Sequence, residues 1–226
     1  MKSFLFFVFI LSASAESLHY SINWPSGLSL GEATLDSTGF SAATGAKSNL
    51  KSWDFKLDID ASVPGFVVRD NYKSMAADNF CTVQLDKSFT HGKHKSDEHL
   101  SFDQQKHSVS RETRNGGGKS ETDVGECARD PLTFIQFLRE ELAHGRIPPQ
   151  QNVIFGAAYS VRVEFTGAQP IKVGEQRMDS DRVLATIKGP SSDLTVEIFF
   201  SRDAARVPLM AKIPLSLGTF SVELQQ

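Results

Sequence analysis

Apolar and polar residues alternate at every second position over much of this chain, and this pattern restricts the fold more than any other feature. In residues 53–61, charged and polar residues separate the apolar side chains, which are Trp53, Phe55, Leu57, Ile59 and Ala61. The same spacing recurs within residues 81–85, 159–165, 194–200 and 220–224. A strand with this pattern buries one face and exposes the other to water, which is typical of antiparallel sheet.

Short stretches rich in Gly, Pro, Ser and Asp separate these runs and predict the turns of the sheet. They are residues 36–39, 63–65, 115–118, 165–167 and 189–192. Their spacing predicts about a dozen short strands arranged as a meander, a sandwich or a barrel. Because the chain shows no internal repeat and no long linker, we expect a single domain.

One segment departs from this rhythm and predicts a helix over residues 130–144. Asp130 is placed as its N-cap, Pro131 occupies the first helical position, and Gly145 follows its end. The apolar residues of the segment form one broad helical face, made of Leu132, Phe134, Ile135, Leu138 and Leu142.

The first fifteen residues have the three parts of a secretory signal peptide. A positive residue comes first, residues 4–11 are an unbroken apolar run, and Ala13 and Ala15 fill the two small positions before a cleavage site. The alternative is a membrane anchor, but about 20 apolar residues are needed to span a bilayer and this run is much shorter. We expect cleavage between Ala15 and Glu16, which leaves residues 16–226 as an exported domain without a membrane span.

Export to the periplasm or to the exterior places the two cysteines in an oxidising compartment. Cys81 and Cys127 are then the only possible intramolecular disulfide pair. The alternative is two free, buried thiols. With two cysteines in the chain, a Cys-rich zinc site is excluded.

The charge of the chain argues against nucleic acid and against an anionic membrane as partners. Its 24 basic and 27 acidic residues give a formal net charge of -3, which lacks the positive field that a phosphate-binding surface requires. Residues 116–120 are similar to the end of a phosphate-binding loop, but that motif requires Gly where this chain has Thr113 and a helix directly afterwards. A hairpin tip accounts better for these residues.

Histidines between two of the expected strands suggest a metal site, because nitrogen and oxygen donors gather within a few residues. The donors are His91, His94, Asp97, Glu98 and His99. Lys93 and Lys95 would repel a cation, and a turn of this composition does not fix the spacing of ligands. We therefore favour a solvated turn without metal, with metal binding by the three histidines as the alternative.

The sequence contains no motif of a known catalytic class. It has neither Gly-x-Ser-x-Gly nor His-Glu-x-x-His, and its cysteines lack the features of an activated thiol. Asp54, Asp58 and Asp60 share the polar face of one strand and are expected to be solvated, whereas a glycosidase needs two carboxylates across a cleft. The sequence predicts no catalytic residue, metal or cofactor, and does not decide whether the protein is an enzyme.

Four segments occur in a recognisable order along the chain. They are GLSLGEA at 27–33, DPLTFIQFLR at 130–139, IFFSRD with VPL within 198–209, and GTF at 218–220. In this order they resemble an exported bacterial family, domain of unknown function 3108. The family usually has Trp where this chain has Ile198 or Phe199. The His-rich and Gly-rich turns between the cysteines are not part of the resemblance.

The resemblance implies a strongly curved antiparallel sheet or open β-barrel with one packed α-helix, broadly similar to periplasmic lipoprotein carriers, and no catalytic residues. Our first hypothesis is a binding or carrier module whose concave, Phe-rich face holds an apolar or envelope-derived ligand such as a lipid. Four of the 17 phenylalanines lie in the signal segment, and the other thirteen could equally fill a core. The second hypothesis is a structural or interaction protein of the cell envelope that presents strand edges to a partner. An enzyme acting on envelope polysaccharide comes third.

Overall fold

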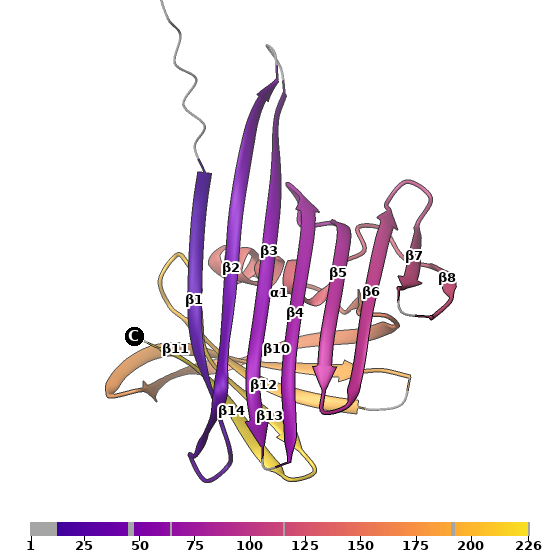
Figure 1. Cartoon of the computed structure of the whole chain (residues 1–226). Helices are drawn as coiled ribbons and strands as arrows, with labels where there is room; N and C mark the ends of the chain where they lie inside the picture. The colour runs from indigo at the N-terminus through magenta and orange to yellow at the C-terminus, as the bar shows by residue number, and fades with distance from the viewer. Residues whose placement is uncertain (1–12, 45–47, 64, 115, 191–192, 226) are drawn as a thin grey trace, which may run out of the picture.

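The computed structural model describes residues 13–44, 48–63, 65–114, 116–190 and 193–225, so the apolar run of the expected signal peptide lies outside the described residues. The described chain forms fourteen strands and one helix (Figure 1). Their bounds are β1 (Ala13–Asn23), β2 (Ser29–Thr44), β3 (Ser48–Val63), β4 (Phe66–Ala77), β5 (Thr82–His91), β6 (His94–Asp103), β7 (Ser108–Thr113), β8 (Lys119–Asp123), α1 (Pro131–Ala143), β9 (Gln151–Ile154), β10 (Ala158–Val173), β11 (Gln176–Lys188), β12 (Asp193–Ser201), β13 (Pro208–Leu215) and β14 (Gly218–Leu224).

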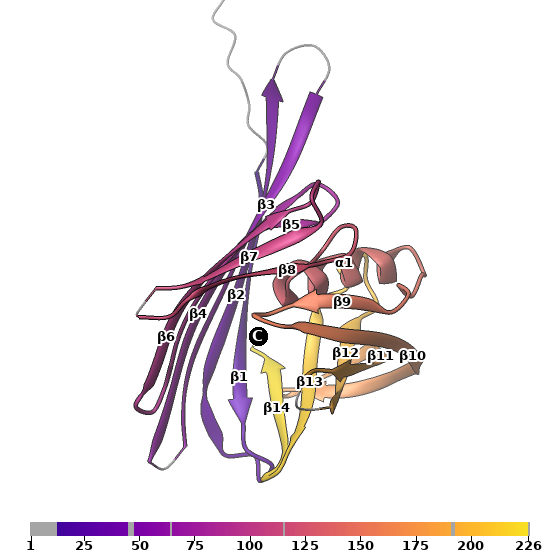
Figure 2. The same cartoon turned by 90° about the vertical axis from the view of Figure 1, so that its right-hand side faces the viewer.

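All of these strands belong to one antiparallel sheet, ordered β8-β7-β6-β5-β4-β3-β2-β1-β14-β13-β12-β11-β10-β9. β1 pairs with both β2 and β14, so the first and last strands of the chain lie in the middle of the sheet. Figure 2 shows the two half-sheets, β1–β8 and β9–β14, turned towards each other with α1 between them. The prediction of a mainly β protein with a strongly curved antiparallel sheet and one packed helix is confirmed, with fourteen strands rather than about a dozen.

Residues 127–130, which we call the closing segment, connect β5 of the first half-sheet with β9 of the second. On one side, the carbonyl of Ala128 accepts a hydrogen bond from the backbone N–H of Thr82 (3.0 Å). On the other side, the carbonyl of Arg129 accepts one from the N–H of Ile154 (2.8 Å). The closing segment therefore joins two parts of the curved sheet that lie far apart in its strand order.

The structure brings the two cysteines together at this closing segment. Cys81 and Cys127 form a disulfide with their Cα atoms 4.7 Å apart and a sequence separation of 46. The side-chain amide of Gln104 strengthens the same junction, because its nitrogen donates to the carbonyls of Thr82 (2.6 Å) and Ala128 (3.0 Å). The start of β5 and the closing segment are thus held by a covalent bond and by hydrogen bonds.

The helix begins where the sequence predicts, because Asp130 caps it. The Asp130 carboxylate accepts hydrogen bonds from the backbone N–H groups of Leu132 (2.7 Å) and Thr133 (3.3 Å). It is fully buried, and the hydroxyls of Ser74 in β4 and Thr82 in β5 also donate to it. Burial raises the pKa of Asp130, and these four donors act in the opposite direction. The cap therefore fixes the position of α1 against the first half-sheet.

Among the described residues, no helix has both the length and the apolar character needed to cross a membrane.

Buried apolar side chains fill the space between the half-sheets in three clusters. The largest packs α1 on the second half-sheet and consists of Phe134, Leu138, Leu142, Val153, Val161, Val163, Val183 and Phe200. A second lies beside the closing segment, where Ala128 and Ile154 pack against Leu85 and Leu100. A third joins Leu132 of α1 to Phe55 of β3 and Tyr72 of β4. The helix thus supplies the core that both half-sheets share.

Two of the predicted turns are wrong. Residues 36–39 lie inside β2, and residues 165–167 lie inside β10. In β10 the register shifts between Phe165 and Gly167, which marks a β-bulge that lets the strand continue past its glycine. In β2 the regular pairing with both neighbouring strands overrides the local turn preference of Asp, Ser and Gly.

β-bulges also expose two apolar residues that the alternation placed on buried faces. Phe165 lies at the bulge of β10 and is exposed. Val83 is exposed because Ala76 pairs with Thr82 and Met75 pairs with Gln84, which leaves Val83 as an extra residue between them. An extra residue shifts the alternation by one position, so the face assigned from sequence is reversed at that point.

Candidate functional site

An apolar groove lies between α1 and the second half-sheet. Its volume is about 400 Å³, within the range of roughly 300–1,000 Å³ that small-molecule sites occupy. The lining residues are Pro131, Phe134, Ile135, Leu138, Val153, Phe155, Tyr159, Val161, Ala185, Ile187, Val196 and Ile198. Among these side chains only the phenol of Tyr159 carries a polar group.

The sequence pattern explains how this groove arises. The helix supplies Phe134 and Leu138, which are four residues apart and therefore share a face. Three strands, β10, β11 and β12, supply residues at two-residue spacing, such as Val196 and Ile198 in β12. Val196 and Ile198 are only half-buried, although they belong to an apolar strand face. The face that the alternation marks as buried is therefore partly open here.

A cluster of charged side chains lies on the inner face of the first half-sheet, and we call it the inner charged cluster. Lys87 Nζ in β5 is 3.0 Å from Glu98 Oε2 in β6, and Arg111 Nε in β7 is 3.1 Å from the same oxygen. The side chains of Lys87 and Glu98 are each 6% exposed. Two cations therefore share one buried carboxylate.

The pKa shifts of this cluster follow from its burial and its hydrogen bonds. Burial lowers the pKa of Lys87, and the hydrogen bond to Glu98 opposes that effect. Burial raises the pKa of Glu98, but the hydrogen bonds from Arg111 and Lys87 outweigh it and hold the pKa below its ordinary value. The carboxylate is thus ionised at neutral pH and compensates the buried lysine.

A second polar group lies beside this cluster on β4 and β5. The Tyr72 hydroxyl donates to Asp70 Oδ2 (2.8 Å), and His91 Nε2 is 2.9 Å from Asp70 Oδ1. Burial, and after it the hydrogen bond to Asp70, raises the pKa of Tyr72. The phenol therefore stays protonated and acts as a donor, which satisfies the buried Asp70 carboxylate.

Phe155 connects the apolar groove with the inner charged cluster. Its ring lines the groove, and Lys87 Nζ lies 4.0 Å from the centre of the same ring. Its carbonyl accepts a hydrogen bond from Lys87 Nζ (3.3 Å), and its ring meets that of Tyr72 edge-on at 5.3 Å. At the next position, a Cβ added to Gly156 would lie 3.4 Å from both Lys87 Nζ and Glu98 Oε2. The turn between β9 and β10 therefore covers the cluster closely and presents Phe155 to the groove.

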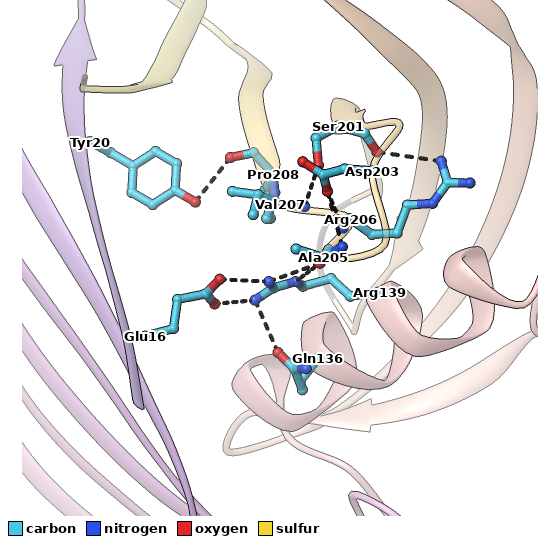
Figure 3. A network of polar contacts seen from close by, with 10 residues as sticks. All are labelled: Glu16, Tyr20, Gln136, Arg139, Ser201, Asp203, Ala205, Arg206, Val207 and Pro208. Carbon is cyan, nitrogen blue, oxygen red and sulfur yellow. Dashed lines mark hydrogen bonds and ion pairs between the residues drawn. The ribbon is translucent and has the colours of Figure 1, made fainter. Parts of the chain in front are cut away.

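A third network ties α1 to β1 and to the loop between β12 and β13 (Figure 3). Arg139 of α1 forms two hydrogen bonds with the Glu16 carboxylate (2.6 and 2.9 Å), and its Nε and Nη2 donate to the carbonyl of Ala205 (3.0 and 2.9 Å). The Arg139 side chain is buried, whereas that of Glu16 is 31% exposed. Two charged groups and one carbonyl thus hold the helix against β1 and the loop.

The loop that supplies Ala205 is itself ordered by hydrogen bonds to an aspartate (Figure 3). Asp203 Oδ1 accepts from the hydroxyl of Ser201 (2.9 Å) and from the backbone N–H groups of Ala205 (3.0 Å) and Arg206 (3.2 Å). The Arg206 guanidinium in turn binds Asp181 of β11. This loop is therefore a rigid support for Arg139.

The structure leaves His91 and His94 side by side but places His99 on the opposite face of the sheet. His91 ends β5 and pairs with His94 at the start of β6, so the turn between them is only two residues long. His91 contacts Asp70 on the inner face, whereas His99 contacts Asp86 (2.8 Å) and Ser101 (3.1 Å) on the outer face. In the part of the chain that the structure describes, no three His, Cys, Asp or Glu side chains are placed to hold a metal ion.

The structure also shows where other residues considered in the sequence analysis lie. Asp58 pairs with Lys56 on the outer face of β3, and Gly116 to Gly118 lie in the turn between β7 and β8. Ala15 and Glu16, at the expected cleavage site, both lie in β1 and pair with Thr38 and Ser37.

Sequence reasoning missed the residues that connect the two parts of the site. Lys87 and Glu98 each lie two residues from a buried leucine, so the alternation already places them on the inner face. A charge at such a position is a signal of a buried ion pair, because a lone buried charge is costly. Phe155 has no comparable signal, since it lies in a turn and not in an alternating run.

Comparisons with known proteins place this fold among proteins without an assigned activity. The family model described as "Protein of unknown function (DUF3108)" matches residues 19–225. No curated protein matches the chain. A solved structure described as "Beta-barrel-like Protein of Domain of Unknown Function DUF1849 from Brucella abortus" is similar with a TM-score of 0.57 and 6% sequence identity, over 96% of this chain and 97% of that one. At this identity the likeness shows a shared fold.

Proposed function

The chain belongs to the DUF3108 family of proteins of unknown function, which confirms the resemblance found in the sequence, and we propose that it is a non-catalytic carrier of an apolar ligand such as a lipid. The observation that carries this proposal is the apolar groove. A groove of about 400 Å³ with twelve lining residues and one polar group fits a molecule that is itself apolar. If these residues only formed a hydrophobic core, we would expect their side chains to fill this space, because protein interiors are close-packed.

The polar networks of the inner face support binding over catalysis. Glu98 is shared by two cations, and Asp70 is held by Tyr72 and His91. A carboxylate with all these partners is not poised to transfer a proton to a sugar, as a glycosidase requires. These carboxylates therefore fit a structural role at the end of the groove.

The free edge of the sheet argues for a carrier over a protein that recruits partners by strand addition. The terminal strand β8 is exposed along its whole length and carries Lys119, Glu121 and Asp123. Charged side chains along an edge strand discourage pairing with another chain.

We also propose that the protein is exported, with cleavage after Ala15. The three-part pattern of the first fifteen residues supports export, as does a disulfide that an oxidising compartment would maintain. Cleavage at this point would make Glu16, which holds Arg139, the first residue of the mature chain. The clamp between β1 and α1 would then be retained after maturation.

The direct test of the carrier proposal is a substitution that fills the groove. Val196 lines the groove, whereas its neighbour Thr195 is exposed on the other face of β12. We expect Val196→Trp to weaken the binding of a fluorescent fatty acid probe at least about tenfold, because the indole occupies the space of the ligand. Thr195→Trp adds the same side chain to the same strand and is expected to leave the affinity unchanged.

The readout is a fluorescence titration with the purified mature protein. Equal affinities of Val196→Trp and the wild type would contradict the assignment of the groove. A wild-type protein that binds no apolar probe would contradict the carrier function itself.

A further inference from the structure

Four turns lie together at one end of the sheet, and we call this end the turn edge. Taken with the adjoining strand ends, they are residues 24–28 between β1 and β2, 65–67 at the start of β4, 91–95 at the end of β5 and the start of β6, and 215–218 at the end of β13 and the start of β14. Figures 1 and 2 show all four at the lower end of the molecule. They lie there together because antiparallel strands that run in the same direction end at the same side of the sheet.

The turn edge carries large apolar side chains that water contacts. Leu28 is 66% exposed, Leu215 is 53% exposed and Leu217 is 68% exposed. Phe66 and Val67 are also among the exposed apolar residues. Single exposed apolar residues are common, but several at the tips of adjacent turns form a patch of the kind that marks an interaction surface.

Packing between the turns holds this patch in place. The Trp24 and Phe220 rings meet edge-on with their centres 5.0 Å apart, which joins the first turn to β14 just after the last turn. The backbone N–H of Gly92 donates to the carbonyl of Val67 (2.8 Å), which joins the two middle turns. The exposed leucines are therefore presented on ordered turns.

The charged residues within the turn edge are basic, although one of its histidines, His91, contacts the Asp70 carboxylate of β4. Residues 24–28, 65–67, 91–95 and 215–218 contain no Asp or Glu. The turn edge thus differs from the chain as a whole, whose net charge of -3 argues against an anionic membrane. The same residues include two lysines and two histidines, all within 91–95. Exposed leucines with an indole beside them, and lysines on another turn of the same edge, are the combination that favours the interface of an anionic bilayer.

From these observations we propose that the turn edge docks on an anionic lipid surface, with Leu28, Leu215 and Leu217 inserted among the lipids and Lys93 and Lys95 against the headgroups. A protein partner would also bury apolar tips, but the absence of acidic residues across four separate turns favours phosphate-bearing headgroups. The proposal goes beyond the carrier function, because it concerns the end of the sheet and not the groove.

Vesicle flotation tests this docking with vesicles of phosphatidylglycerol and phosphatidylethanolamine, and with vesicles of phosphatidylcholine alone. We expect the protein to bind the anionic vesicles and to be released by high salt. The double variant Leu28→Ser with Leu217→Ser should lose about tenfold or more of this binding. Replacing Lys93 and Lys95 by Ser should cost about fivefold for each lysine.

The matched control is Val83→Ser with Ile147→Ser, which removes two exposed apolar side chains away from the turn edge and should leave vesicle binding unchanged. Absence of binding to anionic vesicles, or an equal loss in the control and in the leucine variant, would overturn the proposal. A protein that still binds the fatty acid probe but not the vesicles would refute the docking surface while leaving the carrier function intact.

Discussion

Replacing Glu98 by Gln is expected to lower the free energy of unfolding by about 3–5 kcal/mol, the usual cost of leaving one partner of a buried ion pair uncompensated. Lys87 is the group left behind, and its side chain is only 6% exposed. Arg111 would lose its carboxylate partner in the same variant. Urea unfolding followed by circular dichroism measures the difference.

This destabilisation should depend on pH. The pKa of Glu98 in the folded protein lies below the ordinary value of 4.5, because the hydrogen bonds from Arg111 and Lys87 outweigh the effect of burial. The stabilisation from Glu98 is therefore present above about pH 4.5 and is lost as the pH falls through the folded pKa. The difference between Glu98→Gln and the wild type should shrink over that acidic window.

Glu112 provides the matched control. It pairs with Lys119 at an exposed site on the neighbouring strand β7, and exposed pairs contribute less than about 1 kcal/mol. Glu112→Gln should thus be nearly neutral. If both variants had the same small effect at pH 7, the inner charged cluster would not have the role described above.

Removing the disulfide with Cys81→Ser and Cys127→Ser is expected to lower the free energy of unfolding by about 4 kcal/mol. The bond closes a loop with a sequence separation of 46, and a cross-link of this span restricts the unfolded chain by about that amount in the chain-entropy account. It also holds the closing segment, through which β5 and β9 are connected.

Urea unfolding with and without reductant tests this prediction. The wild type in reductant should approach the double variant, since both lack the cross-link. Hydrogen exchange should become faster at the amides of Thr82 and Ile154, which bind the closing segment. Equal unfolding free energies of the wild type and the double variant would show that the disulfide does not secure the junction.

The sequence predicts those parts of the fold that depend on local pattern. Alternation is enough to predict an antiparallel sheet, because its period is a property of one strand. Asp130, Pro131 and Gly145 mark the helix for the same reason, since a cap acts on the backbone next to it. The β-bulges at Val83 and Phe165 were not predictable, because an extra residue is defined only against the partner strand.

The candidate site likewise has features that the sequence predicts and features that it does not. The apolar strand face at Val196 and Ile198 is visible in the sequence. Whether this face borders an open groove depends on the distance between α1 and β12, which the sequence does not indicate. Arg139 and Glu16 are more than a hundred residues apart, and nothing local in either segment indicates their pairing. The family could be identified from the sequence, because it depends on the order of short segments along the chain and not on the contacts that they make in the fold.

Native mass spectrometry of the protein purified from an envelope fraction is the decisive test of whether the groove carries an apolar ligand. We expect a chain that begins at Glu16, contains the Cys81–Cys127 disulfide and carries a bound apolar molecule. That molecule should be absent from the Val196→Trp variant and present in Thr195→Trp. A bare polypeptide mass in the wild type, together with no uptake of fatty acid probes, would contradict the carrier function.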